Sequence, residues 1–220
     1  MPVMKKFLLR KILKPLGYNL KQYEYRSFMK ALKNTRKKGL VGVEIGTLDG
    51  WHALEMMELL PIKKLYLIDP YRAYKDYDES VKNPRKTQKA LDERMKVAKK
   101  VLEKYGNKVQ FIRKFSDDAA DLIKDNSLDF IYIDGNHQYE FVKSDLKNYY
   151  KKVKKGGFFG GHDYTNSQLT ILENFGVFKA VNEFIKQEPI YFHELDWWVI
   201  KGEEKKPKRK IVKRKKLPSR

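Results

Sequence analysis

The chain has 220 residues and no cysteine, which excludes disulfides and thiolate metal sites and fits a reducing, cytoplasmic location. No apolar run approaches the roughly 18 residues that span a bilayer. The net charge of +20 belongs to the two ends, since residues 39–200 carry 25 basic and 25 acidic side chains. An enzyme of nucleic acids more often carries excess positive charge around its active-site groove as well.

The N-terminal segment predicts two helices. Residues 4–16 place four apolar side chains on one stripe among basic ones, as in a helix that lies on an anionic membrane surface or docks on its own domain. Residues 19–38 predict a second helix that ends at Gly39. We therefore expect a basic helical extension over residues 1–38.

The middle of the chain alternates between apolar strands and amphipathic helices. This pattern predicts an α/β fold of the Rossmann-like, doubly wound type, with a mostly parallel seven-stranded sheet. The last two strands are close enough in sequence to form an antiparallel pair. The strands are expected at residues 40–45, 64–69, 109–115, 128–134, 158–162, 189–195 and 197–200, and the helices at 51–60, 91–105, 116–120, 139–149 and 178–185. This domain spans residues 39–202, and residues 203–220 predict a basic, disordered tail.

Polar residues follow the strands where a doubly wound sheet binds its ligand, at the carboxyl edge. They are Glu44, Asp69, Ser116, Asp134 and Asp163. A carboxylate that closes the second strand can accept both hydroxyls of a ribose, so Asp69 is the ribose candidate. Its alternative role is that of a turn residue before Pro70.

The segment Asp134-Gly135-Asn136-His137 brings a carboxylate and an imidazole to this edge. Such a pair can bind a divalent cation and take a proton from a hydroxyl, although a single histidine is more often structural. Asp163 at the next strand end supplies a second carboxylate. Oxygen ligands favour Mg²⁺ over zinc.

Two stretches carry a resemblance to a known family. The turn Glu44-x-Gly46-x-x-x-Gly50 resembles the first motif of class I S-adenosylmethionine-dependent methyltransferases. The run Ile133 to Glu140, the helix with Asp145-Leu146, and Gly160-Gly-His-Asp163 are similar to small-molecule methyltransferases of the macrocin O-methyltransferase type. They are more distantly similar to catechol O-methyltransferase. The resemblance covers residues 40 to about 186.

The resemblance implies a class I methyltransferase fold, S-adenosylmethionine as methyl donor and assistance by a divalent metal, with Mg²⁺ expected. It makes His137 the catalytic base. Around the cofactor it places Glu44, Gly46 and Thr47 at the methionine end, Asp69 at the ribose, and Ser116 and Asp117, which can also cap a helix, at the adenine. It makes Asp134 and Asp163 the metal ligands, with Asp134 also beside the cofactor. Catechol enzymes have Asn where this chain has Tyr164, so the third metal ligand stays open, with His162 as a candidate.

These observations predict methyl transfer to a hydroxyl of a sugar, glycan or other small molecule. A second hypothesis is an RNA or protein methyltransferase that holds an anionic partner through the basic ends. A third is a module without catalysis, tethered by those ends to a membrane surface or nucleic acid. Asp134, His137 and Asp163 favour an enzyme over the third.

Overall fold

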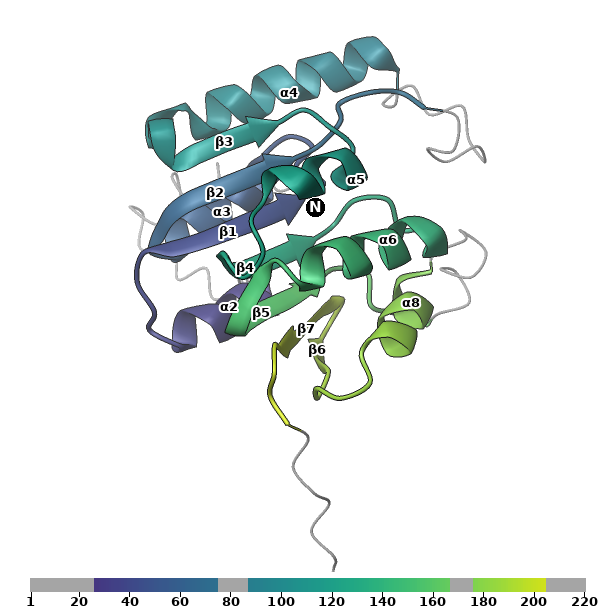
Figure 1. Ribbon diagram of the computed structural model, residues 1–220. Coiled ribbons are helices and arrows are strands. Elements are labelled where there is room, and N and C mark those ends of the chain that lie inside the picture. The colour runs from purple at the N-terminus through teal and green to yellow at the C-terminus, as the bar shows by residue number, and fades with distance from the viewer. Residues whose placement is uncertain (1–25, 75–86, 167–175, 205–220) are drawn as a thin grey trace, which may run out of the picture.

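The computed structural model describes residues 26–74, 87–166 and 176–204. Seven strands form one sheet in the order β3-β2-β1-β4-β5-β7-β6 (Figure 1). The strands are β1 (Leu40–Ile45), β2 (Ile62–Ile68), β3 (Val109–Ile112), β4 (Leu128–Ile133), β5 (Val153–Gly161), β6 (Tyr191–His193) and β7 (Asp196–Ile200). The first five run parallel, whereas β7 is antiparallel to both β5 and β6. The predicted mostly parallel, seven-stranded sheet with an antiparallel C-terminal pair is confirmed.

Helices cover both faces of the sheet (Figure 1). One hydrophobic core contains side chains of α2 (Ser27–Asn34), α3 (Trp51–Leu59) and the end of α4 (Gln88–Leu102). The other contains side chains of α5 (Ser116–Ala119), α6 (Tyr139–Tyr150) and α8 (Val177–Phe184). Short 3₁₀ turns follow α4 and α5, at Glu103–Lys108 and Ala120–Leu122. The sheet is therefore the middle of three layers.

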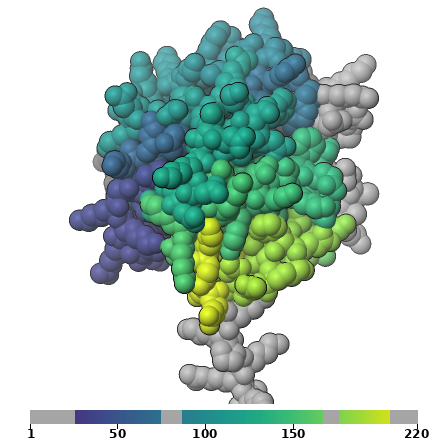
Figure 2. Space-filling model, in the orientation of Figure 1, coloured from purple at the N-terminus to yellow at the C-terminus, as the bar shows by residue number. Residues whose placement is uncertain are grey.

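The described part of the basic N-terminal segment packs on the sheet. Phe28, Met29 and Leu32 of α2 are buried in the same core as α3 and the strands. Figure 2 shows α2, in purple, on the same face of the molecule as the yellow end of the β7 strand. Residues 26–38 thus belong structurally to the sheet domain. The predicted helix at 4–16 and nearly all of the predicted tail lie outside the described residues.

Four sequence-based details are wrong. Helix α2 ends at Asn34, whereas the sequence predicted a helix that continues to residue 38. Strand β3 ends at Ile112, three residues earlier than expected. Strand β5 begins at Val153, before the glycine pair that was expected to precede it. Ser116 is the first residue of α5, and no side chain caps that helix, so the expected N-cap cluster is absent there.

Within the described residues, no helix combines the length and apolarity that a membrane crossing requires.

Candidate functional site

The turn between β1 and α3 packs tightly against the end of β4. Gly46 has φ +87°, in the left-handed region that favours glycine, and a Cβ there would lie 2.0 Å from the carbonyl oxygen of Asp134. Only glycine brings the two strand ends so close together. The turn from β1 and the loop after β4 therefore form one continuous edge.

Glu44 is buried beside this turn, with 1% of its surface exposed. Its Oε1 lies 2.7 Å from Nδ1 of His52, whereas Oε2 has no hydrogen-bond partner among the described residues. Burial and the nearby Asp134 raise the pKa of Glu44 well above its usual value. A buried oxygen without a partner is costly, so this acceptor suits a donor supplied by a ligand.

Asp69 follows β2 and organises two loops. Its Oδ2 accepts the backbone N–H of Leu48 at 3.0 Å, and its Oδ1 accepts that of Tyr71 at 2.8 Å. Both donors lie in residues with positive φ, which are sparsely populated outside glycine. A carboxylate offers about four acceptor positions, so these bonds leave room for ribose hydroxyls. The turn role and the ribose role are compatible in this geometry.

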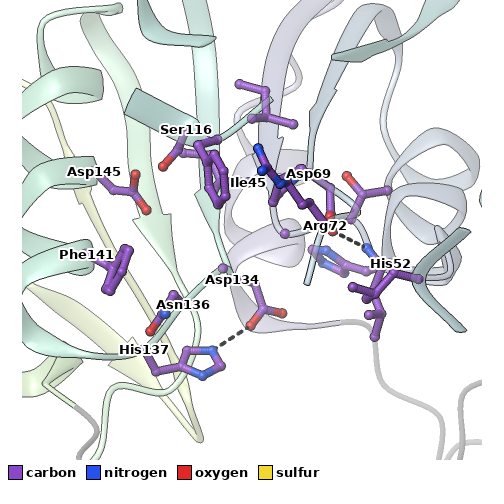
Figure 3. Close-up of a pocket in the computed structure, with 18 of the residues that line it drawn as sticks. Ile45, His52, Asp69, Arg72, Ser116, Asp134, Asn136, His137, Phe141 and Asp145 are labelled. Carbon is purple, nitrogen blue, oxygen red and sulfur yellow. Dashed lines mark hydrogen bonds and ion pairs between the residues drawn. The ribbon is translucent and has the colours of Figure 1, made fainter. Parts of the chain in front are cut away.

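A cavity of about 560 Å³ opens at this carboxyl edge (Figure 3). Its walls come from the turn after β1, the ends of β2, β3 and β4, and helix α6. Gly46, Thr47, Asp69, Ser116, Asp134 and His137 line it, as the sequence predicted for a shared edge. The volume is typical of a site that holds a cofactor-sized molecule.

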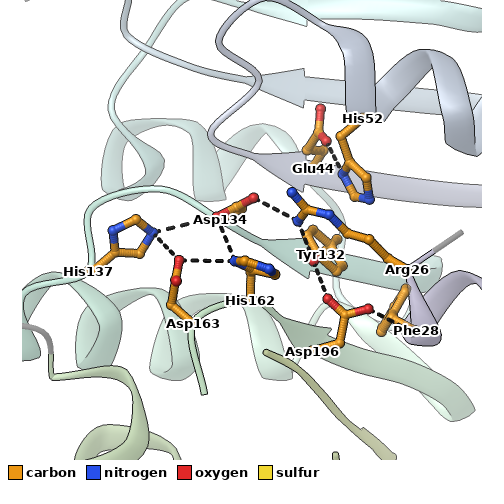
Figure 4. A network of polar contacts seen from close by, with 10 residues as sticks. All are labelled: Arg26, Phe28, Glu44, His52, Tyr132, Asp134, His137, His162, Asp163 and Asp196. Atoms are coloured by element: carbon orange, nitrogen blue, oxygen red, sulfur yellow. Dashed lines mark hydrogen bonds and ion pairs between the residues drawn. The ribbon is translucent and has the colours of Figure 1, made fainter. Parts of the chain in front are cut away.

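Two acids and two histidines meet beside this cavity (Figure 4). His137 Nε2 lies 2.9 Å from Oδ2 of Asp163 and 3.5 Å from Oδ1 of Asp134. His162 Nδ1 lies 3.1 Å from the same oxygen of Asp163. Asp163 has φ +58°, an uncommon conformation for a residue other than glycine. The sequence-based expectation that these strand ends lie together describes this cluster well.

The cluster couples the charges of its members. Burial alone would lower the pKa of His137, but its bonds to Asp134 and Asp163 raise that pKa to about 9. Burial alone would raise the pKa of both acids, but His137 and the other nearby cations outweigh it and hold both pKa values below the usual range. At neutral pH the free protein therefore favours two carboxylates and an imidazolium.

Arg26 brings a further cation from the segment before α2. Its Nη1 donates to Asp134 Oδ2 at 2.9 Å and to the hydroxyl of Tyr132 at 2.5 Å. Tyr132 in turn donates to Asp196, which also accepts the backbone N–H of Phe28 at 2.9 Å. Figure 4 shows this chain of contacts, which fixes the start of α2 to β4 and β7.

The cluster fits a divalent cation by its donor set. Asp134, His162 and Asp163 each offer one ligand atom, and these atoms lie within 4.8 Å of one another. Two carboxylates and one imidazole suit Mg²⁺ or Mn²⁺ better than a structural zinc ion. Arg26 already binds the second oxygen of Asp134, so a cation there would share that carboxylate with a guanidinium.

Two predicted cofactor residues do not line the cavity: Glu44, which is buried beside the glycine turn, and Asp117. Asp117 is exposed, and its Oδ1 accepts hydrogen bonds from Ser144 at 2.6 Å and Asn148 at 2.8 Å. It joins α5 to α6 and does not line the cavity. Ser116, its neighbour, does line the cavity.

Sequence reasoning gave no site role to several polar residues that line the cavity, among them Arg26, His52 and Asp145. Arg26 lies in a segment that was read as an extension, and no local pattern links it to β4. His52 follows Gly50 in the first turn of α3, so its nearness to the glycine turn was a usable signal. Asp145 lies three residues after Val142 and one before Leu146, both buried, so its position on the buried face of α6 was visible.

The chain matches a family model described as a methyltransferase domain over residues 43–164. It is 36% identical over 138 residues to an uncharacterized protein of Acanthamoeba polyphaga mimivirus. That match covers 60% of this chain and 56% of the viral protein, so the chain spans little more than half the length of this relative.

Solved structures share the fold at low identity. A calicheamicin methyltransferase has a TM-score of 0.64 at 15% identity, with 92% of this chain and 88% of that chain covered. A putative caffeoyl-CoA O-methyltransferase from Staphylococcus aureus has a TM-score of 0.59 at 17% identity, with 92% of this chain and 93% of that chain covered. The O-methyltransferase NovP has a TM-score of 0.53 at 16% identity, with 80% of this chain and 77% of that chain covered. At such identities the likeness concerns the fold alone.

Proposed function

Because the chain belongs to the methyltransferase-domain family, whose members are class I S-adenosylmethionine-dependent methyltransferases, we propose that it transfers a methyl group from S-adenosylmethionine to a hydroxyl oxygen. The observation that carries this proposal is the His137–Asp163–Asp134 cluster, which adjoins a cavity of cofactor size. An acid–base group beside a cofactor cavity is what methylation of a hydroxyl requires.

The residues around the glycine turn fit the methyl donor. We assign the ammonium of its methionine part to Glu44, whose Oε2 has no hydrogen-bond partner within the criterion among the described residues, and Asp69 has acceptor positions for its ribose. When bound, S-adenosylmethionine supplies a methyl group activated by the adjacent sulfonium. The protein then has to align acceptor and donor and take up one proton, and alignment alone can remove much of a barrier.

His137 is the proposed base. Its contacts with Asp134 and Asp163 favour the protonated ring, and a cation held by those carboxylates would favour the neutral ring that accepts a proton. We propose that Asp134 and Asp163, with His162 as the third ligand, hold Mg²⁺ or a similar ion. Such an ion supplies Lewis acidity that polarises the acceptor hydroxyl.

Sugar hydroxyls are the proposed acceptors. This choice rests on the resemblance of residues 133–163 to the macrocin O-methyltransferase type. The neutral balance of residues 39–200 also supports a small acceptor over a polyanion. The basic ends, which would hold an RNA, protein or membrane surface in the alternative, lie mostly outside the described residues.

The test is transfer of labelled methyl from S-adenosylmethionine to a panel of sugars and glycosides, with RNA and protein substrates as comparison. His137→Gln should lower the rate on the best acceptor by roughly 10²-fold or more, as expected for loss of a general base. His193→Gln is the matched control, because His193 is exposed, lies 2.9 Å from the hydroxyl of Ser27 and does not line the cavity. Mg²⁺ should raise the wild-type rate, and a chelator should reverse that rise.

Equal rates for the wild type and His137→Gln would overturn the base assignment. Methylation confined to RNA or protein would replace the sugar acceptor with the second hypothesis. Absence of transfer to any acceptor, together with absence of S-adenosylhomocysteine binding, would contradict the proposed function itself.

A further inference from the structure

Asp145 is a buried carboxylate that takes no part in the proposed methyl transfer. It lies on α6, is 3% exposed, and lines the cavity beside Ser116 and Phe141 (Figure 3). Its Oδ1 has no hydrogen-bond partner in the part of the chain that the structure describes. Burial raises the pKa of Asp145 to about 7, and a hydrogen bond with the Ser116 side chain opposes that rise. An unpaired buried oxygen at a cavity wall is an acceptor prepared for a ligand donor.

Aromatic and apolar side chains line the part of the cavity that contains Asp145. Tyr74 makes an edge contact with Phe115, with ring centroids 5.2 Å apart, and lies 6.2 Å from the ring of Phe141. All three rings line the cavity, as does Leu91. Aromatic walls with a few polar groups are typical of sites for planar heterocycles, because the rings cover the faces and the polar groups bind an edge.

The direction of the cavity also suits a nucleoside. Asp69 directly follows β2. Ser116 begins α5, the helix after the neighbouring edge strand β3. A ribose held by Asp69 would direct its base toward Ser116 and Asp145. This step rests on the proposed function, which supplies the nucleoside.

We propose that Asp145 accepts a hydrogen bond from the exocyclic amino group of the cofactor's adenine and thereby selects a 6-aminopurine over a 6-oxopurine. The amino group of adenine is a donor and satisfies the carboxylate. The oxygen of hypoxanthine at the same position is an acceptor, so it would face the carboxylate without a bond. Sites with a buried polar group reject analogues that leave it unpaired.

The probes are S-adenosylhomocysteine and its 6-oxo analogue, S-inosylhomocysteine, titrated calorimetrically into the full chain at pH 8. At that pH a carboxyl with a pKa of about 7 is mainly ionised. The wild type should prefer the adenosyl ligand by roughly tenfold or more. In Asp145→Asn the preference should fall below about threefold, because the amide can turn its NH₂ toward the 6-oxo group.

Two further variants complete the test. Asp145→Ala should weaken binding of the adenosyl ligand and should not weaken binding of the inosyl ligand, which loses an unfavourable acceptor. Asp118→Asn, an exposed acid on α5, should keep the wild-type preference. The ratio of the two affinities within one variant does not depend on the fraction of protein that is folded, so a destabilised variant still reports.

If the wild type binds S-adenosylhomocysteine and both Asp145 variants keep its preference, the inference about Asp145 is overturned and the proposed function stands. If the wild type binds neither ligand, the proposed function fails and the role of Asp145 fails with it. A preference lost in Asp145→Asn and Asp145→Ala but kept in Asp118→Asn supports the inference.

Discussion

The guanidinium of Arg26 lies 2.9 Å from Oδ2 of Asp134, so a residue before α2 pairs with the acid that ends β4 (Figure 4). The same acid is a proposed ligand of the divalent cation. Arg26 therefore sets the electrostatic environment of the cluster although it lies outside the segment that matches the family model. A positive charge at this distance opposes the binding of a second cation.

Arg26→Met should strengthen binding of Mn²⁺, used as a probe for the divalent site, by roughly three- to tenfold. The substitution keeps most of the side-chain length and removes the charge that competes for Asp134. Lys33→Met, which removes an exposed charge from α2, should leave the affinity unchanged. Titration followed by electron paramagnetic resonance measures both, and equal affinities in the two variants would contradict the competition.

Gly46→Ala should lower the free energy of unfolding by more than about 2 kcal/mol, because it combines a left-handed φ with a collision against the backbone of Asp134. Gly156→Ala is the matched control. Gly156 has φ +74° but nothing within 4 Å of the added Cβ. Its substitution should therefore lower the free energy of unfolding by only about 1 kcal/mol, from backbone strain. Urea denaturation measures both variants. A similar loss in both would show that the close approach of the two strand ends does not matter.

Asp69→Asn should weaken the binding of S-adenosylhomocysteine by roughly 10- to 100-fold. An amide keeps one acceptor oxygen, so it cannot serve the N–H groups of both Leu48 and Tyr71 and also the ribose. Asp92→Asn changes an exposed acid that pairs with Arg113 and should bind the ligand as the wild type does. Calorimetric titration separates the two outcomes, and unchanged affinity in Asp69→Asn would remove the ribose role.

Asp145 should make stability depend on pH in a defined direction. Its pKa is raised to about 7 by burial, above the unfolded value near 3.9, so between these values the folded protein binds more protons than the unfolded chain. Its contribution to the free energy of unfolding therefore falls as pH rises from about 4 to about 7, by at most about 1.4 kcal/mol per pH unit.

Asp145→Asn removes this contribution, so the variant should gain stability relative to the wild type as pH rises over that window. Urea denaturation at pH 5, 6 and 7 measures the difference. Glu44 and the other buried groups are present in both proteins and cancel in the comparison. A constant difference across the window would mean that the Asp145 carboxyl titrates at its ordinary value.

Much of the fold could be predicted because apolar runs and helical spacing are local signals. The acids at the strand ends could be placed at one edge because parallel strands share their carboxyl ends. Asp134, His137 and Asp163 illustrate this. Asp134 and His137 are three residues apart, and one helix and one strand separate them from Asp163. Their contacts follow from the order of the sheet.

Arg26 and Asp117 show where the sequence was insufficient. The role of Arg26 depends on how α2 packs against β5 and β7, a long-range contact that no local pattern encodes. Asp117 has the right position along the chain, but Ser144 and Asn148 of α6 bind its carboxylate outside the cavity. In both cases the packing of a helix, and not the residue's place in a motif, decides what the side chain contacts.

The most direct test of the central claim is thermal unfolding of the full chain with and without S-adenosylhomocysteine. A ligand that binds only the folded protein adds about 2.7 kcal/mol at one hundred times its dissociation constant, which raises the midpoint by several degrees. We expect such a rise, and a further rise when Mg²⁺ is added that Asp134→Asn abolishes. An unchanged midpoint at millimolar S-adenosylhomocysteine would contradict the assignment of this cavity to the methyl donor.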